Sequence, residues 1–211
     1  MALEIRHPKL NELENAISVF YAAFKGEFNY IFGRYFEYGK RLLINFYKRT
    51  IGKKDLKNFV IAKINNKIVG AANLDFTNPN LIKYFFYFIK LNMHFLRAYT
   101  VMGLKRAIKT TMSMYWFFIE NFRTNSCYIN LFAVLPKFHN RGIGTKMLRK
   151  IEKITKRKKL SSMTLDVAFS DVPARHLYKK VGFTESFRFS HSILKYLNAI
   201  EGIFGMKKIL K

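Results

Sequence analysis

Residues 131–150 have the sequence LFAVLPKFHNRGIGTKMLRK, and this stretch decides the fold more than any other. The apolar run CYINLFAV at 127–134 predicts a strand buried on at least one face, which Pro136 ends because proline cannot donate to a ladder. The segment RGIGT at 141–145 then predicts a turn that starts a helix. The first helical turn leaves N–H groups without internal partners, so this order favours a bound phosphate or pyrophosphate.

The residues after the turn have the spacing of an amphipathic helix, with one apolar stripe and a basic opposite side. The apolar positions are Met147, Leu148, Ile151 and Ile154, and the basic ones are Lys146, Arg149, Lys150, Lys153, Lys156 and Arg157.

Two common phosphate loops do not fit this turn. A dinucleotide-binding fingerprint needs a third glycine where this chain has Met147, and a P-loop needs a glycine–lysine–Ser/Thr run that does not occur here. The stretch instead resembles the acyl-CoA-binding segment of the GCN5-related N-acetyltransferase (GNAT) superfamily. That pattern is Gln or Arg, two residues, Gly, any residue, and Gly or Ala, after a strand ending in Val-x-Pro. Here it is HNRGIG at 139–144 after VLP at 134–136, so His139 departs from the usual residue and puts one side-chain contact in doubt.

A second segment resembles the same family at the expected distance downstream. The short strand 165–167 is followed by DVPARHLYKKVGF at 171–183, where the family has Asn-x-x-Ala-x-x-Leu-Tyr-x-Lys-x-Gly-Phe. Asp171 stands where the family usually has Asn. The second half of this pattern alone would fit any helix with a glycine C-cap. Two segments in the right order and spacing make the resemblance specific.

The resemblance implies an α/β GNAT (acyl-CoA N-acyltransferase) fold and a single domain over residues 1–211. Its mixed central sheet would have about six to seven strands flanked by helices, with a helical insertion at 75–126 between the third and fourth strands. Strands are predicted at 3–6, 58–64, 67–74, 127–134, 161–169, 184–190 and 203–210, with a hairpin turn at Asn65-Asn66. Besides the helix after the glycine turn, helices are predicted at 11–24, ending at Gly26, at 35–50 and at 171–181, with an extra helical turn within 192–201.

Aromatic residues crowd the segment 27–39, where the family places the acceptor side of its cleft. They are Phe28, Tyr30, Phe32, Tyr35, Phe36 and Tyr38. Two interpretations stand beside each other: these rings form a substrate wall, or they pack in the core.

The insertion at 75–126 predicts two helices, one opened by Pro79 and one capped by Thr100. The apolar stripe of the second comprises Val101, Leu104, Ile108, Met112, Tyr115, Ile119 and Phe122. A helical hairpin here is expected to cover the acceptor end of the cleft. The alternatives are a packing element without substrate contact, and a basic amphipathic surface that rests on a membrane or a partner.

The resemblance also implies the reaction: transfer of an acetyl or short acyl group from acetyl-CoA, with coenzyme A as co-substrate, to a primary amine that attacks directly. Tyr178 would be the general acid, and an N–H near Val134 would stabilise the oxyanion. The residues implied to bind the cofactor are Phe132, Ala133, Val134, His139, Asn140, Arg141, Gly142, Ile143, Gly144, Thr145, Asp171 and Ala174.

The general base is left open by the sequence. The family's base positions early on the fourth strand hold Tyr128 and Asn130, and neither is a good base near pH 7. A water chain, Glu27, Asp75 or Glu120 would then take the amine proton. The acceptor is equally open between a small-molecule and a peptide amine.

Composition and charge bear on the compartment, on metal binding and on possible partners. Cys127 is the only cysteine, and residues 1–24 lack the order of a signal peptide, so a cytoplasmic protein without a disulfide is expected. The five histidines are scattered and predict no metal site. The net charge of +25 has two explanations: compositional drift beside an anionic cofactor, which we prefer, or affinity for nucleic acid or a membrane surface.

Competing hypotheses follow from the two departures from the family pattern, at His139 and Asp171, and from the missing general base. A GNAT-like module that binds acyl-CoA without turnover is one, and a basic nucleic-acid-associated protein is another. The C-terminal strands and the insertion are the candidate surfaces for a homodimer.

Overall fold

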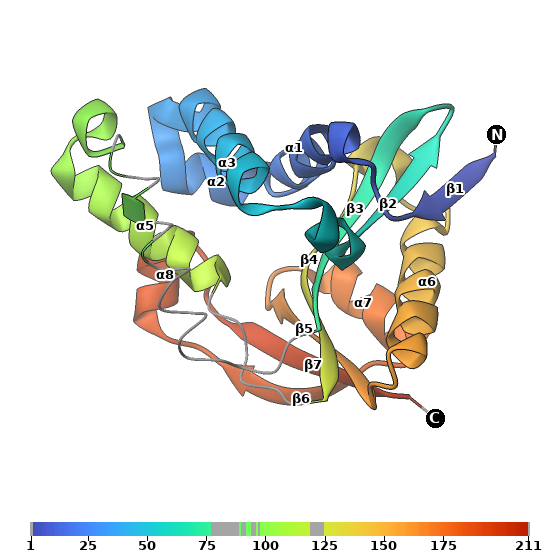
Figure 1. Cartoon of the computed structure of the whole chain (residues 1–211). Coiled ribbons are helices and arrows are strands. Elements are labelled where there is room, and N and C mark those ends of the chain that lie inside the picture. The colour runs from blue at the N-terminus through green and yellow to red at the C-terminus, as the bar shows by residue number, and fades with distance from the viewer. Residues whose placement is uncertain are drawn as a thin grey trace.

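The computed structural model describes residues 2–76, 89, 92–93, 96, 98–118 and 125–210. Within 98–118, side chains are described only as far as Ser113. A seven-stranded sheet in the order β1-β2-β3-β4-β5-β7-β6 runs through the described part (Figure 1). The strands are β1 (Leu3–Arg6), β2 (Phe59–Ile64), β3 (Lys67–Asp75), β4 (Ser126–Val134), β5 (Ser162–Ala168), β6 (Thr184–Phe189) and β7 (Ile203–Ile209). Only the β4–β5 pair among these is parallel, so the sheet is mixed, as predicted.

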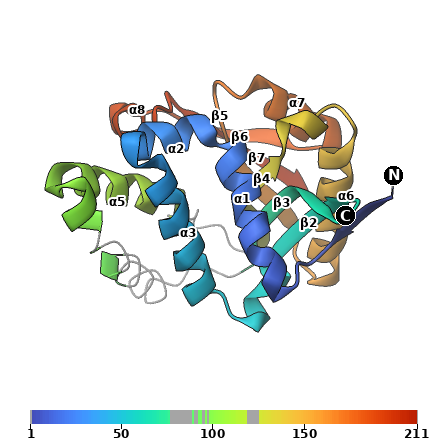
Figure 2. The same cartoon turned by 90° about the horizontal axis from the view of Figure 1, so that it is seen from above.

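Helices cover both faces of the sheet (Figures 1 and 2). On one face lie α1 (Leu13–Ala23), α2 (Lys25–Phe32) and α3 (Phe36–Thr50), and on the other lie α6 (Ile143–Arg157) and α7 (Val172–Val181). Beside α2, α5 (Leu104–Phe118) packs against α8 (Ser192–Asn198). Short 3-10 turns are η1 (Leu10–Glu12), η2 (Gly33–Tyr35), η3 (Lys53–Asn58) and η4 (Pro136–Phe138).

The predicted amphipathic helix after the glycine turn is confirmed. Met147, Leu148 and Ile151 of α6 are fully buried against β2, β3 and β4, while Lys146 and Arg149 are exposed. The predicted hairpin is confirmed as well, because Asn65 and Asn66 join β2 to β3 with φ values of +47° and +63°. Asparagine tolerates this left-handed backbone better than most residues.

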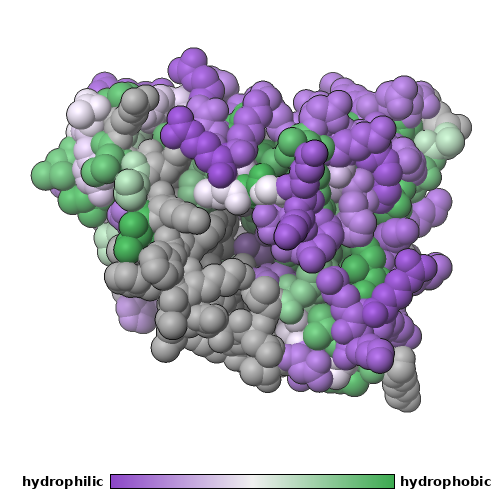
Figure 3. All heavy atoms as spheres, viewed as in Figure 1, coloured by the Kyte–Doolittle hydropathy of each residue, from purple (hydrophilic) through white to green (hydrophobic). Residues whose placement is uncertain are grey.

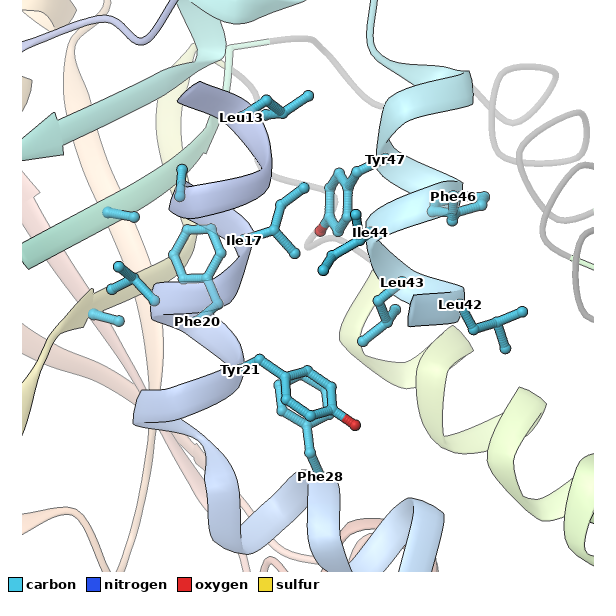
Figure 4. Close-up of a cluster of buried hydrophobic side chains, with 14 of the residues drawn as sticks. Leu13, Ile17, Phe20, Tyr21, Phe28, Leu42, Leu43, Ile44, Phe46 and Tyr47 are labelled. Carbon is cyan, nitrogen blue, oxygen red and sulfur yellow. The ribbon is translucent and has the colours of Figure 1, made fainter. Parts of the chain in front are cut away.

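The aromatic segment at 27–39 is mainly core. The rings of Tyr21 and Phe28 stack with their centroids 4.4 Å apart (Figure 4). Phe32 is fully buried, and its ring lies near both of them. None of the six aromatic residues predicted as a substrate wall lines the main cleft described below, so that interpretation is wrong for this cleft. The helix end predicted at Gly26 is also wrong, because α1 ends at Ala23 and α2 contains Gly26.

The apolar stripe predicted for α5 faces outward. Leu104, Ile108 and Met112 are exposed. The buried side of α5 carries small or polar residues instead, namely Ala107, Thr110, Thr111 and Ser113. Ser113 Oγ donates to the carbonyl of Leu197 in α8 over 2.7 Å, which ties the polar side inward.

Several predictions for the insertion lie outside the part that the structure describes. These are the helix opened by Pro79, the side chains of Tyr115, Ile119 and Phe122, and Glu120. Within the described residues, no helix is long and apolar enough to span a bilayer.

Candidate active site

Strands β4 and β5 separate part-way along their length, and the site is built around this opening. Their parallel pairing runs only from Ser126/Ser162 to Ile129/Leu165. Beyond that point β4 continues to pair with β3, while β5 continues to pair with β7. The edges that face each other across the opening therefore carry backbone groups without partners in the sheet.

A β-bulge in β4 accompanies this separation. Asn73 pairs with Leu131 and Leu74 pairs with Ile129, so Asn130 is an extra residue on β4. Ile129 therefore lies in the core under α6 and α7, whereas Leu131 packs against the opposite core under α1. Simple alternation would have placed both on one face.

The register fixes which backbone groups of β4 face the opening. Leu135 donates its N–H to the carbonyl of Val69 over 2.8 Å. In an antiparallel ladder this bond flanks a non-hydrogen-bonded pair, here Gly70 and Val134. The N–H and C=O of Val134 consequently point away from β3 toward the opening. By the same alternation so do those of Phe132, which is opposite Ala72.

The start of α6 forms an anion cradle beside this opening. Asn140 and Gly142 have left-handed backbone, with φ of +59° and +71°. The first helical hydrogen bond runs from Lys146 N to Gly142 O, so the N–H groups that precede it in the first turn have no acceptor within the helix. A Cβ atom built on Gly142 would meet nothing within 4 Å, so a ligand has room to approach this turn. Such a turn suits a diphosphate by charge and by space.

A cleft of about 1370 Å³ joins the cradle to the opening. The predicted site residues that line it are Phe132, Ala133, Val134, His139, Asn140, Gly142, Ile143, Gly144, Thr145, Asp171, Ala174 and Tyr178. Arg141 does not line the cleft, and its guanidinium lies over the ring of Phe138, 5.4 Å from the centroid. The cleft continues past the opening to Glu27 of α2 and to Phe187 and Phe189 of β6.

Tyr178 of α7 lines the cleft and is buried. Its ring packs edge-on against Phe132, with centroids 6.2 Å apart, and against Phe183. Burial, and secondarily the charge of Asp171, raises the pKa of the Tyr178 phenol above its ordinary value. The phenol therefore keeps its proton at neutral pH and can donate a hydrogen bond.

The two departures from the expected motif both have a structural role. Asp171 is the N-cap of α7, where its Oδ1 accepts from Ala174 N over 3.0 Å. Aspartate caps a helix as well as asparagine does. His139 Nε2 lies 2.7 Å from the carbonyl oxygen of Val134, one of the two groups of that residue that face the opening.

An acidic residue that the sequence analysis did not select lies at the other end of the opening. Asp166 of β5 lines the cleft, and Tyr128 Oη donates to its Oδ2 over 3.1 Å. Tyr128 also lies opposite Asp75 of β3 in the ladder. Strand alternation was the sequence signal that could have identified Asp166. Leu165 and Val167 are buried on one face, so the carboxylate between them lies on the other face of the sheet.

Of the base candidates from the sequence, Glu27 lines the cleft and Asp75 does not. Tyr128 and Asn130, at the family's base positions, also line it. Within the described residues, no group of three His, Cys, Asp or Glu side chains is placed to hold a metal ion. Cys127 is buried, and burial raises the pKa of its thiol to about 12.

Comparison with known families agrees with this geometry. The model of the Acetyltransferase (GNAT) family matches residues 19–183 of the 211. The chain belongs to this GNAT acetyltransferase family. The matched range contains the cradle, the opening between β4 and β5, and Tyr178.

Solved structures of GNAT acetyltransferases share this fold at low sequence identity. The PaiA N-acetyltransferase from Thermoplasma acidophilum, in complex with coenzyme A, is 19% identical with a TM-score of 0.58 over the whole of both chains. The ribosomal-protein-S18-alanine N-acetyltransferase from Escherichia coli is 12% identical with a TM-score of 0.57, over all of this chain and 95% of that one. Ard1 from Thermoplasma volcanium is 16% identical with a TM-score of 0.58, over all of this chain and 99% of the other. A search of curated proteins found no match.

Proposed function

We propose that this GNAT acetyltransferase moves an acetyl or short acyl group from acyl-CoA to a primary amine by direct attack in a ternary complex. One observation carries the proposal. One continuous cleft is lined by the anion cradle of α6, the backbone of Val134, the Tyr178 phenol and the Tyr128–Asp166 pair. A CoA thioester and an amine would thus enter the same opening from opposite ends.

The fit to CoA rests on the groups already described. The first-turn N–H groups of α6 and the left-handed turn at Gly142 would hold the diphosphate. Lys180 also lines the cleft and adds positive charge. Along the opening, the N–H and C=O groups of Phe132 would bind an amide of the pantetheine arm, while the N–H of Val134 would face the acyl carbonyl.

We assign the role of general base to Asp166. An amine acceptor carries a proton at neutral pH and must lose it before it can attack. The Asp166 carboxylate would bind the ammonium group and take that proton, while the hydrogen bond from Tyr128 fixes its orientation. Glu27 of α2 also lines the cleft and would add a second negative charge that favours a cationic acceptor.

The chain's other groups then complete the transfer. The amine nitrogen forms a C–N bond with the acyl carbon, the C–S bond breaks, and the electron pair goes to sulfur. The N–H of Val134 donates to the carbonyl oxygen as it gains negative charge. The Tyr178 hydroxyl donates to the leaving sulfur. Two protons leave the nitrogen: the first goes to Asp166 and from there to solvent, and the second restores the Tyr178 hydroxyl, whose own proton has gone to the thiolate.

A direct test is release of free thiol from acetyl-CoA in the presence of a panel of amines. The panel should include amino sugars, polyamines, amino acids, and peptides with a free N-terminus or lysine. Cys127 is buried and will not react with the thiol reagent under native conditions. We expect release above the amine-free rate for at least one class, with a product heavier by one acetyl group. Tight acetyl-CoA binding in calorimetry without release for any amine would instead favour a non-catalytic acyl-CoA-binding module.

A further inference from the structure

The outward side of α5 carries an aliphatic stripe that the enzyme site does not use. Leu104, Ile108 and Met112 follow one another at four-residue spacing and are 66, 43 and 48% exposed. We call these three residues the α5 stripe. Val101, which precedes α5 and is separated from it by Gly103, is also exposed. In Figure 3 hydrophobic atoms gather at the edge of the molecule that α5 occupies in Figure 1.

A basic hollow of about 390 Å³ lies at the start of the same helix. Lys105, Arg106 and Lys109 line it together with the rings of Tyr30 and Tyr196. The Lys109 ammonium is held between these rings, 4.3 Å and 4.7 Å from their centroids. The hollow adjoins the α5 stripe because Leu104 belongs to both.

Both tyrosines are positioned at this surface by α2 and α8. Tyr30 is 41% exposed and Tyr196 is 57% exposed. Tyr30 Oη donates to the Tyr196 carbonyl oxygen over 3.0 Å. Tyrosine at the edge of an aliphatic patch is typical of surfaces that sit at a membrane–water boundary.

The charge of this region has one sign. The described residues 98–113 contain Lys105, Arg106 and Lys109 and no Asp or Glu. Arg106 is braced by its hydrogen bond to the carbonyl of Phe32, at 3.2 Å, and lines the hollow. A partner for this surface must therefore be anionic, and it must also accept aliphatic side chains.

We propose that the α5 stripe and the basic hollow dock this enzyme on the surface of an anionic phospholipid bilayer. The stripe would enter the boundary between headgroups and acyl chains, and the cations of the hollow would meet lipid phosphates. A second copy of the chain fits less well, since its own surface brings the same positive charge. RNA also fits less well, because it offers no apolar phase to the α5 stripe, and the rings of Tyr30 and Tyr196 already lie against the Lys109 ammonium.

Co-sedimentation of the full-length protein with vesicles tests the proposal. We expect binding to vesicles that contain phosphatidylglycerol and little binding to pure phosphatidylcholine vesicles, with weakening as salt rises. The triple variant L104Q/I108Q/M112Q should bind the anionic vesicles on the order of tenfold more weakly. Lys105→Glu should also weaken binding severalfold, because it reverses one charge at the hollow.

Matched controls separate these effects from general changes in polarity and charge. L10Q/I209Q removes two exposed aliphatic side chains elsewhere, and Lys153→Glu reverses an exposed charge on α6. Both should bind vesicles like the wild type. Thermal unfolding and acetyl-CoA binding report whether each variant is folded, and both should be unchanged in the triple variant because its positions are exposed.

Three results would overturn the proposal. One is equal vesicle binding by the triple variant and the wild type. Another is conversion of a stable dimer to a monomer by the triple variant in analytical ultracentrifugation, which would make the stripe a contact between copies. The third is salt-sensitive binding to single-stranded RNA that Lys105→Glu abolishes, together with no binding to anionic vesicles.

Discussion

The Tyr128 hydroxyl and the Asp166 carboxylate meet 3.1 Å apart just where β4 and β5 stop pairing. Considered singly, Tyr128 and Asp166 are ordinary residues of β4 and β5. Together they place a negative charge, with a fixed orientation, at the end of the cleft opposite the anion cradle. This arrangement is the basis for proposing a diphosphate at the cradle and an ammonium group beside Asp166.

Asp166→Asn should lower kcat by about 10²-fold or more, since an amide cannot accept the ammonium proton and general base catalysis typically contributes this much. Acetyl-CoA affinity should change little, because the residue lies away from the cradle. Steady-state kinetics and calorimetry give the two quantities. Glu14→Gln, an exposed carboxylate on α1, is the matched control and should retain wild-type turnover. Full activity of Asp166→Asn would remove it from the chemistry.

Tyr128→Phe should have a smaller effect than Asp166→Asn, because the hydroxyl orients the carboxylate and does not take the proton. We expect a loss of about three- to tenfold in kcat, in line with the loss of one charge-assisted hydrogen bond. The double variant tests coupling: Tyr128→Phe should add almost nothing once Asp166 is already Asn. Additive losses in kcat would mean that the two residues act separately.

Tyr178→Phe should lower kcat far more than it changes acyl-CoA affinity, because the ring stays in place and only the donor to the leaving sulfur is lost. The expected loss in kcat is about 10²-fold. Tyr38→Phe removes a hydroxyl from α3, outside the cleft, and serves as the control. Equal turnover by Tyr178→Phe and the wild type would leave Tyr178 with a packing role only.

His139→Ala should tighten CoA binding by about two- to fivefold. The His139 ring bonds the Val134 carbonyl, which faces the opening and would otherwise bind an amide of the pantetheine arm. In the variant the ligand no longer has to displace this ring, so binding gains the net free energy of about one hydrogen bond. Titration calorimetry measures the effect. Weaker binding by the variant would show that the ring contacts the ligand itself.

The local parts of the fold were predictable from the sequence. The helix that carries Met147 and Ile151 follows from the 3.6-residue spacing, and the turn at Asn65 and Asn66 follows from their tolerance of positive φ. Both features depend on residues near one another in the chain. The glycine turn and the Tyr178 segment were found because motif spacing is also local.

The parts that depend on distant neighbours were not predictable. Alternation cannot reveal the extra residue at Asn130, which turns Ile129 and Leu131 to opposite faces. Nothing near Asp166 in the sequence indicates that Tyr128, 38 residues earlier, donates to it. Periodicity located the α5 stripe but could not show that the stripe faces outward. That orientation depends on α8, a distant segment against which the small and polar residues on the other side of α5 pack.

Far from the cleft, a network of charges joins the first two strands. Glu12 Oε2 accepts from Arg6 Nη1 over 2.7 Å, and Glu12 Oε1 accepts from Lys63 Nζ over 2.7 Å. The Glu12 side chain is only 13% exposed. The hydrogen bond from Arg6 outweighs burial and, with help from Lys63, holds the pKa of the Glu12 carboxyl well below its usual range.

Glu12→Gln should therefore reduce the free energy of unfolding at pH 7 by about 1–2 kcal/mol. A carboxyl whose folded pKa is lowered stabilises the protein above its unfolded pKa of about 4.3, and this contribution is lost as pH falls toward the folded pKa. The difference between variant and wild type should thus shrink below about pH 4. Urea unfolding of both proteins at neutral and acidic pH measures this difference.

Glu14→Gln, whose pair with Lys48 is half exposed, is the control and should differ from the wild type by less than about 0.5 kcal/mol. Equal stability of Glu12→Gln and wild type at pH 7 would contradict the assigned role of the network.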